Sequence, residues 1–184
     1  MHTKYLALVL LVACSHSKPT AEDPVKRGEQ LVQLGGCGDC HTPKTFDPKA
    51  HMPVPDYTHM LAGHPEGAPE PEAAPGAHDM AVIGPTFTSF KVGFGTVYAR
   101  NLTPDKDTGL GNWTADQFVQ TMRTGHRQGS GRALLPPMPW QNLAPASEAD
   151  LRAIFAYLQS IPAVANHVPD PKVPAEMLAI GGDK

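Results

Sequence analysis

The feature that most constrains this chain is the run Cys37-Gly38-Asp39-Cys40-His41, with two cysteines three residues apart and a histidine directly after them. In a C-x-x-C-H motif the two thiols add to the vinyl groups of a haem, and the histidine ligates the iron. A zinc site would need a second ligand pair, and a redox dithiol would need a strand before it and a helix after it. The sequence offers neither context. We therefore predict one covalent haem c, anchored by Cys37 and Cys40, with His41 as the proximal iron ligand.

The N-terminus has the character of a bacterial targeting segment. In residues 1–13, Lys4 precedes an apolar run that is much shorter than the roughly 20 residues of a membrane-spanning helix. The run ends in Leu11-Val12-Ala13-Cys14, which resembles a lipoprotein cleavage site, so Cys14 is predicted to be the lipidated first residue of the mature chain. An ordinary signal peptide, or a free thiol at Cys14, is the alternative. Residues 14–22 are then a polar tether, and the protein is expected in the bacterial periplasm, lipid-anchored to a membrane.

Length and composition allow one modest domain. The chain has 184 residues, of which 20 are prolines and only 7% are aromatic, so a haem would fill part of the interior that side chains fill elsewhere. The formal net charge of -3 gives no sign of a nucleic-acid-binding protein.

Three segments are predicted to be helices. Residues 22–34 begin with acidic residues and Pro24, and Gly35-Gly36 ends them; Gly28 inside this helix suggests either the close approach of another helix or a tolerated glycine. Residues 114–124 begin with Thr114 and Gln117 in capping-box positions. The clearest helix follows Ser147, with apolar residues at helical spacing until Pro162.

Residues 42–91 are dense in proline, which argues against helix and central strand and favours an extended surface loop. Histidines and methionines recur in this insertion. Thioether and imidazole side chains together suit copper, although their irregular spacing also fits simple packing around a haem. These residues are His51, Met52, His59, Met60, His64, His78 and Met80.

A methionine among prolines, Met138, is the predicted sixth ligand of the iron. It lies in Leu134-Leu135-Pro136-Pro137-Met138-Pro139-Trp140, where the rigid backbone would keep a weak thioether ligand in place. Met80 and His78 are the alternatives. A basic stretch precedes this loop, and it is either a solvated helix end or part of a docking surface. Its members are Arg123, His126, Arg127 and Arg132.

With these elements in place, the chain resembles the class I cytochrome c family over residues 23–164. It is similar to single-haem periplasmic cytochromes and dehydrogenase-associated cytochrome domains that carry the runs found here at residues 101–105, 108–113 and 136–140. The resemblance implies an all-α fold, with cytochrome c-like helices around one covalent haem, a long proline-rich loop insertion at 42–91 and a C-terminal tail at 165–184. It also implies Cys37 and Cys40 as thioether anchors, with His41 proximal and Met138 distal.

The expected function is electron transfer, with iron cycling between Fe(II) and Fe(III) while both ligands stay bound. A dehydrogenase is the expected donor and an oxidase or another cytochrome the acceptor, with Arg123, Arg127 and Arg132 contributing to docking. The alternatives are a peroxidase-like haem enzyme with an open distal site, and a haem or copper sensor in which Met138 is displaced. Peroxide turnover would favour the enzyme, and a ligand-responsive, redox-silent haem would favour the sensor.

Overall fold

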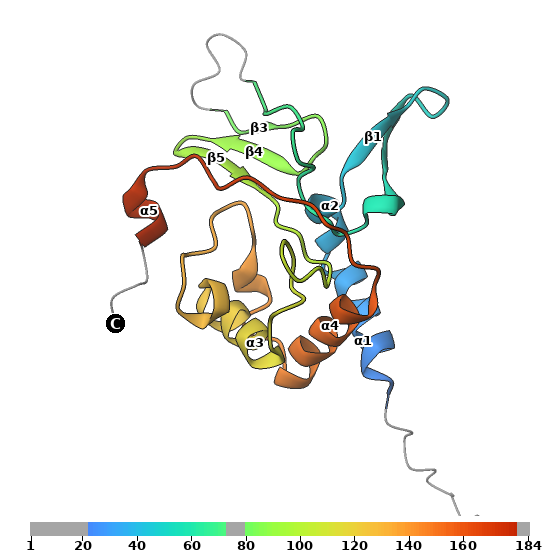
Figure 1. The fold of residues 1–184 in the computed structure, drawn as a ribbon, viewed down its shortest axis with the longest axis vertical. Helices are drawn as coiled ribbons and strands as arrows, with labels where there is room; N and C mark the ends of the chain where they lie inside the picture. The colour runs from blue at the N-terminus through green and yellow to red at the C-terminus, as the bar shows by residue number, and fades with distance from the viewer. Residues whose placement is uncertain (1–21, 73–79, 180–184) are drawn as a thin grey trace, which may run out of the picture.

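The computed structural model describes residues 22–72 and 80–179 (Figure 1). The proposed signal peptide, Cys14 and His78 lie outside these residues. The helices are α1 (Pro24–Leu34), α2 (Cys37–His41), α3 (Ala115–Thr124), α4 (Glu148–Ser160) and α5 (Ala175–Ala179), with 3-10 turns η1 (Tyr57–His59), η2 (Arg127–Gly129) and η3 (Trp140–Asn142). The strands are β1 (Lys44–Asp47), β2 (Met52–Pro55), β3 (Val82–Ile83), β4 (Ser89–Val92) and β5 (Gly95–Tyr98).

The three long helices lie where the sequence predicts, although α1 begins at Pro24, two residues after the predicted start at residue 22. Pro24 opens α1, and the Asp23 side chain accepts a hydrogen bond from the Val25 amide. The capping box of α3 is complete, and Gly125 ends this helix in a left-handed conformation. Ser147 caps α4 through the Asp150 amide. These ends are fixed by contacts within one turn of chain, which is why the sequence alone locates them.

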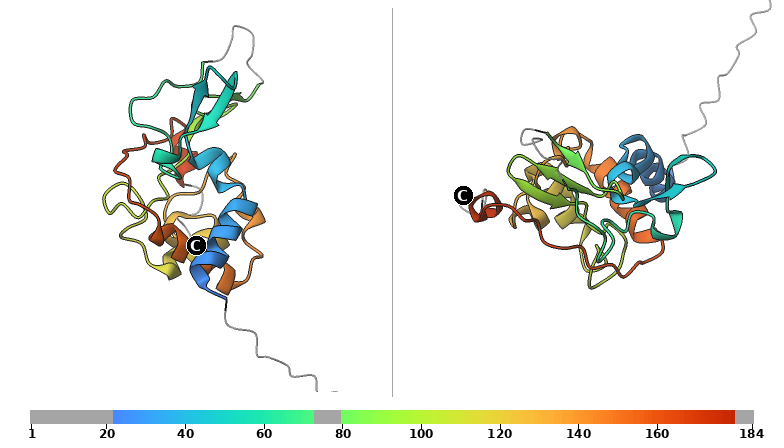
Figure 2. Two further views of the ribbon diagram at one scale, coloured as in Figure 1. Left: turned by 90° about the vertical axis from the view of Figure 1, so that its right-hand side faces the viewer. Right: turned by 90° about the horizontal axis from the view of Figure 1, so that it is seen from above.

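The core lies where α1 crosses α4 and α3 packs against α4 (Figures 1 and 2). Gly28 is buried at the first crossing, and a Cβ atom there would lie 1.9 Å from the Ala153 carbonyl oxygen. The close approach suggested for Gly28 is therefore confirmed. On the other side of α4, the rings of Phe118 and Phe155 have centroids 5.5 Å apart. The crossing places the C-terminal end of α1 directly before α2, which carries the C-x-x-C-H motif.

The prediction of an all-α fold is wrong. The proline-rich insertion contains a two-stranded antiparallel sheet, β1–β2, and most of a three-stranded antiparallel sheet, β3–β4–β5. Figure 1 shows both sheets on the opposite side of α2 from the helical core, with the β1–β2 hairpin projecting from the molecule.

Two local features explain the error. Pro53 and Pro55 lie within β2, which pairs only with β1, so a proline nitrogen can face the free edge without removing a ladder hydrogen bond. In the second sheet, Ser89 pairs with Tyr98 and Val92 with Gly95 around a turn at residues 93–94. The described prolines of the insertion lie at a sheet edge or outside the strands, and β4, the central strand of the second sheet, contains no proline.

The segment after α4 runs back across the molecule to the second sheet (Figure 1). The Asn166 side-chain amide donates to the carbonyls of Ala62 (2.7 Å) and His64 (2.9 Å), and Lys172 forms a backbone bridge with Thr96. This segment therefore ties the helical core to the loops that follow α2. None of the helices in the described ranges is both long and apolar enough to cross a membrane.

Candidate haem site

The C-x-x-C-H motif forms a single helical turn, α2, which begins after Gly36 in a left-handed conformation (φ 63°). The C-terminal end of this turn is held by one side chain. The Lys44 ammonium on β1 donates to the carbonyl oxygens of Gly38 (3.1 Å), Asp39 (2.7 Å) and Thr42 (3.0 Å). A cation at the carbonyl end of a helix satisfies acceptors that have no partner within the helix.

His41 is held ready to act as a ligand. Its side chain is buried, and its Nδ1 atom lies 2.7 Å from the carbonyl oxygen of Arg100. Because a carbonyl oxygen only accepts, Nδ1 carries the hydrogen and Nε2 has a free lone pair. Burial lowers the pKa of His41, which keeps the ring in the neutral form that binds metals.

The Nε2 atom of His41 is the ring nitrogen left to bind a metal ion. It makes no hydrogen bond with any described residue, because the bond of this ring to the Arg100 carbonyl oxygen is made by Nδ1. The Nε2 lone pair is therefore not occupied by any described residue.

The two thiols of the motif fit covalent haem attachment. Neither Cys37 nor Cys40 forms a disulfide, and both are partly exposed on the same turn as His41. Burial raises the pKa of both thiols, so they are kept as neutral thiols. Two free thiols beside a histidine with an unpaired Nε2 form a donor set that suits a haem c.

The loop at residues 61–64 holds the backbone at His41 and Thr42 through two hydrogen bonds. The Leu61 amide donates to Thr42 Oγ1 (3.0 Å), and the Gly63 amide donates to the His41 carbonyl oxygen (2.8 Å). Thr42 and Leu61 are both buried. The motif is thus held by tertiary hydrogen bonds on both sides, and the sequence analysis did not identify Thr42, Lys44 or Arg100 as parts of the site.

The run at residues 101–108 has a structural role. Asn101 Oδ1 accepts from the Thr103 amide (2.9 Å), and Asn101 Nδ2 donates to the Val164 carbonyl oxygen (2.8 Å). Asp105 accepts hydrogen bonds from the Thr108 amide and hydroxyl. These bonds connect the chain after Arg100 to the segment after α4, and so position the carbonyl that holds His41.

Met138 lies on the loop between α3 and α4. The loop is attached to the end of α3 by a hydrogen bond from the Leu134 amide to the Gly125 carbonyl oxygen (2.7 Å), and the Met138 amide donates to Leu135 (3.2 Å). The Met138 side chain is half-buried, and the Pro136-Pro137 peptide bond is cis. Its assignment as the sixth ligand stays a prediction. Of the two alternatives, Met80 is exposed and His78 is not described.

The histidines of the insertion do not converge. His64 is buried and bonded to Thr88, whereas His59 is exposed and paired with Asp56 at 2.7 Å. In the part of the chain that the structure describes, there is no cluster of three or more His, Cys, Asp or Glu side chains placed to hold a metal ion. The copper interpretation of this segment gains no support.

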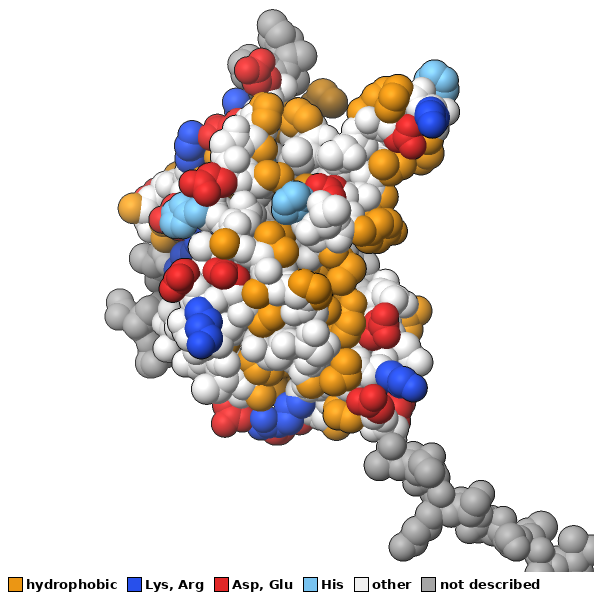
Figure 3. Space-filling view, turned by 45° about the vertical axis from the view of Figure 1, so that its right-hand side comes forward, with side chains coloured by type: hydrophobic (Ala, Val, Ile, Leu, Met, Phe, Trp, Pro, Cys, Tyr) orange, Lys and Arg blue, Asp and Glu red, His pale blue; other side chains and the backbone are white. Residues whose placement is uncertain are grey.

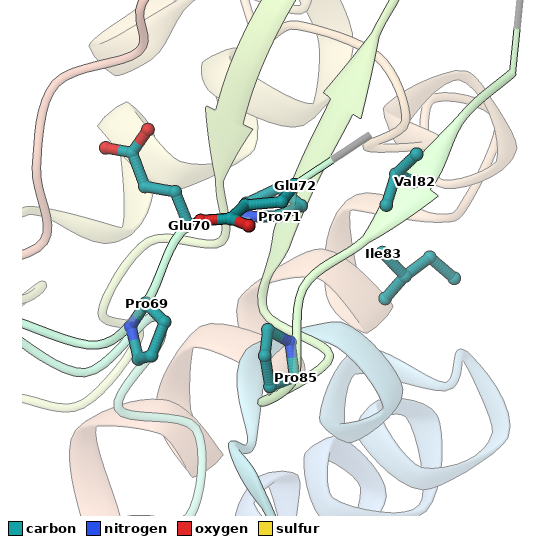
Figure 4. Close-up of a pocket in the computed structure, with 7 residues that line it drawn as sticks. All are labelled: Pro69, Glu70, Pro71, Glu72, Val82, Ile83 and Pro85. Atoms are coloured by element: carbon teal, nitrogen blue, oxygen red, sulfur yellow. The ribbon is translucent and has the colours of Figure 1, made fainter. Parts of the chain in front are cut away.

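A pocket elsewhere on the molecule is a different site. It is lined by Pro69, Glu70, Pro71, Glu72, Val82, Ile83 and Pro85 (Figure 4). None of these residues belongs to the motif, and Glu70 is already bonded to the Tyr98 hydroxyl and the Lys172 ammonium. The pocket therefore has no donor set for a haem.

Comparison with known proteins places this site in a family, although no family model matches the chain. The chain is 31% identical over 178 residues, 95% of its length, to the gluconate 2-dehydrogenase cytochrome c subunit of Pantoea cypripedii. It is 29% identical over 181 residues to the alcohol dehydrogenase (quinone) cytochrome c subunit of Gluconobacter oxydans. A diheme cytochrome c-type protein of Cereibacter sphaeroides is 24% identical over 172 residues.

The coverage of these relatives is partial. The chain spans 32% of the first relative, 30% of the second and 48% of the third, so it corresponds to one portion of larger cytochrome proteins. Together with the C-x-x-C-H turn, these similarities show that the chain belongs to the cytochrome c family and is related to the cytochrome domains of dehydrogenases. The prediction of this family is confirmed.

Proposed function

We propose that this protein is an electron carrier that holds one haem c with His/Met ligation within residues 23–164. Cys37 and Cys40 would anchor the haem, His41 would bind the iron on the proximal side, and Met138 would bind it on the distal side. When bound, the haem supplies one-electron chemistry through the Fe(II)/Fe(III) couple. In this proposal the proline-rich insertion at 42–91 belongs to the same domain, with its sheets on the opposite side of α2 from the helical core (Figure 1).

Contacts from Arg100 and Lys44 hold the proposed proximal ligand and the two cysteines in place. A fixed ligand geometry is what an electron carrier needs for rapid electron transfer. The Arg100 carbonyl orients the His41 ring, and Lys44 holds the turn that bears both cysteines. A thioether at the sixth position stabilises the ferrous state and leaves no open site for a substrate. The observation that carries the proposal is the 2.7 Å bond between His41 Nδ1 and the Arg100 oxygen, because it leaves the Nε2 lone pair free on the same helical turn as two free thiols.

The test is an absorption spectrum of the haem-loaded protein in both oxidation states, extended to the near-infrared band of methionine-ligated ferric haem. The wild type should show this band, and Met138→Ala should lose it while keeping its covalent haem. Met80→Ala is the matched control and should keep the band. A wild-type protein that lacks the band and binds carbon monoxide readily would contradict the proposal and favour the enzyme or sensor alternative.

A dehydrogenase is the proposed electron donor, since the relatives are cytochrome subunits of such enzymes. The proposed contact surface is the β1–β2 hairpin, which follows α2 directly. Figure 3 shows apolar side chains gathered on this projecting hairpin and continuing down the adjoining face of the molecule. Phe46, Met52 and Tyr57 are exposed there, and exposed apolar patches on soluble domains mark contact sites.

This contact surface can be tested by stopped-flow reduction with gluconate 2-dehydrogenase as donor. Phe46→Ser should slow reduction by the enzyme but not reduction by ascorbate, whereas Ile83→Ser, an equal change on β3, should alter neither rate. Equal rates for wild type and Phe46→Ser would reject the hairpin, and no reduction of the wild type by the enzyme would reject this donor.

Attachment to a membrane in the bacterial periplasm, through a lipid on Cys14, remains part of the proposal. Its support is the run of small residues before Cys14 at the end of a short apolar segment. Wild-type protein expressed in a Gram-negative host should sediment with membranes, and Cys14→Ser should appear in the soluble periplasmic fraction. A soluble wild-type protein would contradict lipidation.

A further inference from the structure

His41 is held at two of its atoms by two different loops. Its Nδ1 atom is bonded to the Arg100 carbonyl oxygen (2.7 Å), and its own carbonyl oxygen accepts a hydrogen bond from the Gly63 amide (2.8 Å). Neither Arg100 nor Gly63 lies in a helix or a strand. Loop backbone is more mobile than the elements it connects, so the positions of these two partners depend on contacts with other parts of the chain.

Gly63 contacts both of these groups. Besides donating to His41, it lies against the Arg100 carbonyl: a Cβ atom at Gly63 would be 2.6 Å from that carbonyl carbon and 2.8 Å from its oxygen. The φ of Gly63 is 81°, a left-handed conformation that favours glycine. A displacement of Gly63 would therefore disturb both hydrogen bonds of His41 at once.

The loop that carries Gly63 has an unfavourable conformation of its own. Leu61 is buried with a φ of 60°, which a leucine rarely adopts. Backbone bonds on either side join the loop to the segment around Arg100: the Leu102 amide donates to Leu61 (2.9 Å), and the His64 amide donates to Ala99 (2.9 Å). A strained loop keeps its shape only where the surrounding structure makes several contacts with it.

Asn166, in the segment after α4, supplies contacts of this kind from a distant part of the chain. Its Nδ2 atom donates to the carbonyl oxygens of Ala62 (2.7 Å) and His64 (2.9 Å), the residues on either side of Gly63. Its Oδ1 atom accepts from the Glu66 amide (2.9 Å). One side chain thus fixes three backbone groups of the loop, and Gly63 lies between two of them.

The same short segment also holds Arg100. The Arg100 guanidinium donates to the carbonyl oxygens of Val168 (3.0 Å) and Pro169 (2.8 Å), and Val168 is buried. The segment after α4 therefore contacts both partners of His41: it holds Gly63 through the side chain of Asn166, and Arg100 through two backbone carbonyls.

We propose that Asn166 is a positioning residue for the proximal ligand: it fixes Gly63, and through Gly63 the Arg100 carbonyl that orients the His41 ring. The inference rests on the proposed function, because the ring orientation matters for electron transfer only if His41 binds the iron. A hydrogen bond at the second nitrogen of a metal-binding histidine fixes the ring and raises its basicity. Loosening this bond would make His41 a weaker electron donor, favour Fe(II) and raise the midpoint potential.

The chemistry of the contacts explains why an asparagine is needed. The side chain at this position must donate two hydrogen bonds and accept one, which a primary amide does and a carboxylate or a hydroxyl does not. Asn166→Ala removes all three bonds without changing the charge of the protein. A shift of the potential in this variant therefore reports geometry rather than the loss of a charge.

The first experiment measures the exchange of the His41 Nδ1 hydrogen with deuterium by NMR, together with the midpoint potential, in the haem-loaded full chain. Asn166→Ala should raise the potential and speed this exchange about tenfold or more, the factor expected for the loss of one or two hydrogen bonds. Asn112→Ala removes the bond of an exposed asparagine to the Lys106 carbonyl, and as the matched control it should change neither quantity. The amide of Leu151, buried in α4, reports global unfolding.

A second pair of variants disturbs Gly63 directly. Gly63→Ala places a Cβ atom against the Arg100 carbonyl, so it should change the exchange and the potential in the same direction as Asn166→Ala. Gly67→Ala is the control, because Gly67 has a similar left-handed φ of 73° but no atom within 4 Å of the added Cβ. If Gly63→Ala does not fold or attach haem, Asn166→Ala decides the question.

Wild-type exchange and potential in Asn166→Ala, with the covalent haem attached, would overturn the inference alone. An acceleration at His41 no larger than that of the Leu151 amide would also overturn it, because Asn166 would then only stabilise the fold. So would a fall of the potential, which would indicate entry of water rather than a weaker histidine bond. Absence of covalent haem from the wild type would instead overturn the proposed function, on which the inference rests.

Discussion

The two sides of the candidate haem site are built differently. On the proximal side, His41 is buried, its ring is fixed by Arg100, and its helical turn is held by Lys44 and Thr42. On the proposed distal side, Met138 is half-buried on a loop joined to α3 by a backbone hydrogen bond at Gly125 and by the Arg123 bond to the Ala144 carbonyl oxygen. The proposed proximal ligand, His41, is positioned by the same contacts that hold the fold, whereas the position of Met138, the proposed distal ligand, depends on the conformation of one loop.

This difference predicts two kinds of response to mutation. A change on the proximal side should lower the free energy of unfolding, because the ligand and the core share their contacts. A change on the distal side should alter the ligation of the iron while most of the core stays intact. Each of the following substitutions tests this distinction, in order of decreasing expected effect.

Gly28→Ala tests the helix crossing that supports the proximal side. A Cβ atom at Gly28 would meet the Ala153 carbonyl at 1.9 Å, so α1 and α4 would have to separate. We expect a loss of about 3 kcal/mol in the free energy of unfolding, despite a gain of about 1 kcal/mol in helix propensity. Guanidinium titration measures it. Gly93→Ala, where no atom lies within 4 Å of the added Cβ, is the matched control, and an equal effect at both sites would contradict the crossing.

Gly125→Ala tests the distal loop. Gly125 has a φ of 71°, and a Cβ atom there would lie 2.3 Å from the Trp140 ring, two residues after Met138. The left-handed backbone alone should cost about 1 to 2 kcal/mol. The near-infrared band should also weaken and carbon monoxide should bind, since Trp140 must move. A variant with reduced stability but an intact band would show that the distal ligand does not depend on this loop.

Thr42→Val removes a buried hydrogen bond on the proximal side while keeping the shape of the side chain. The Leu61 amide would lose its acceptor in the interior, which should cost about 1 to 2 kcal/mol. The near-infrared band should remain, in contrast to Gly125→Ala. Thr58→Val, at an exposed position of η1, is the control. Loss of the band in Thr42→Val would mean that the two sides are not independent.

His64 should give the smallest effect, a dependence of stability on pH. Burial lowers the pKa of His64 below its ordinary value of 6.5, so the unfolded chain binds a proton that the folded chain does not. Stability should therefore decrease as the pH falls below about 6.5, with a positive slope against pH. Nearby charged and polar groups are Glu70, Tyr98 and Thr88.

Unfolding titrations of the haem-loaded protein between about pH 7 and pH 5, just below the ordinary pKa of histidine, measure this slope. His64→Asn should flatten it, whereas His51→Asn, at an exposed position of the β1–β2 turn, should leave it as in the wild type. An unchanged slope in His64→Asn would assign the pH dependence to another group.

Elements fixed by neighbouring residues were predictable. The caps at Thr114 and Ser147, and the stops at Gly35 and Gly125, act within one helical turn, and the three helices are confirmed. Asp23, which was placed inside the first helix, is instead its cap. The C-x-x-C-H motif is local in the same way, since its spacing reflects the chemistry of attachment. The strands β1 and β2 were missed, because whether a proline is tolerated depends on which edge of the strand is free.

The sequence by itself determined the family, the haem motif and the helices, because their signals lie within a few residues of each other. Only the tertiary structure decided how the site is held. It brought the Arg100 carbonyl to His41, across 59 positions of the chain, and the Arg100 guanidinium to the carbonyls of Val168 and Pro169. Such contacts depend on the packing of distant segments, and neither composition nor periodicity encodes which carbonyl or which cation will meet the motif.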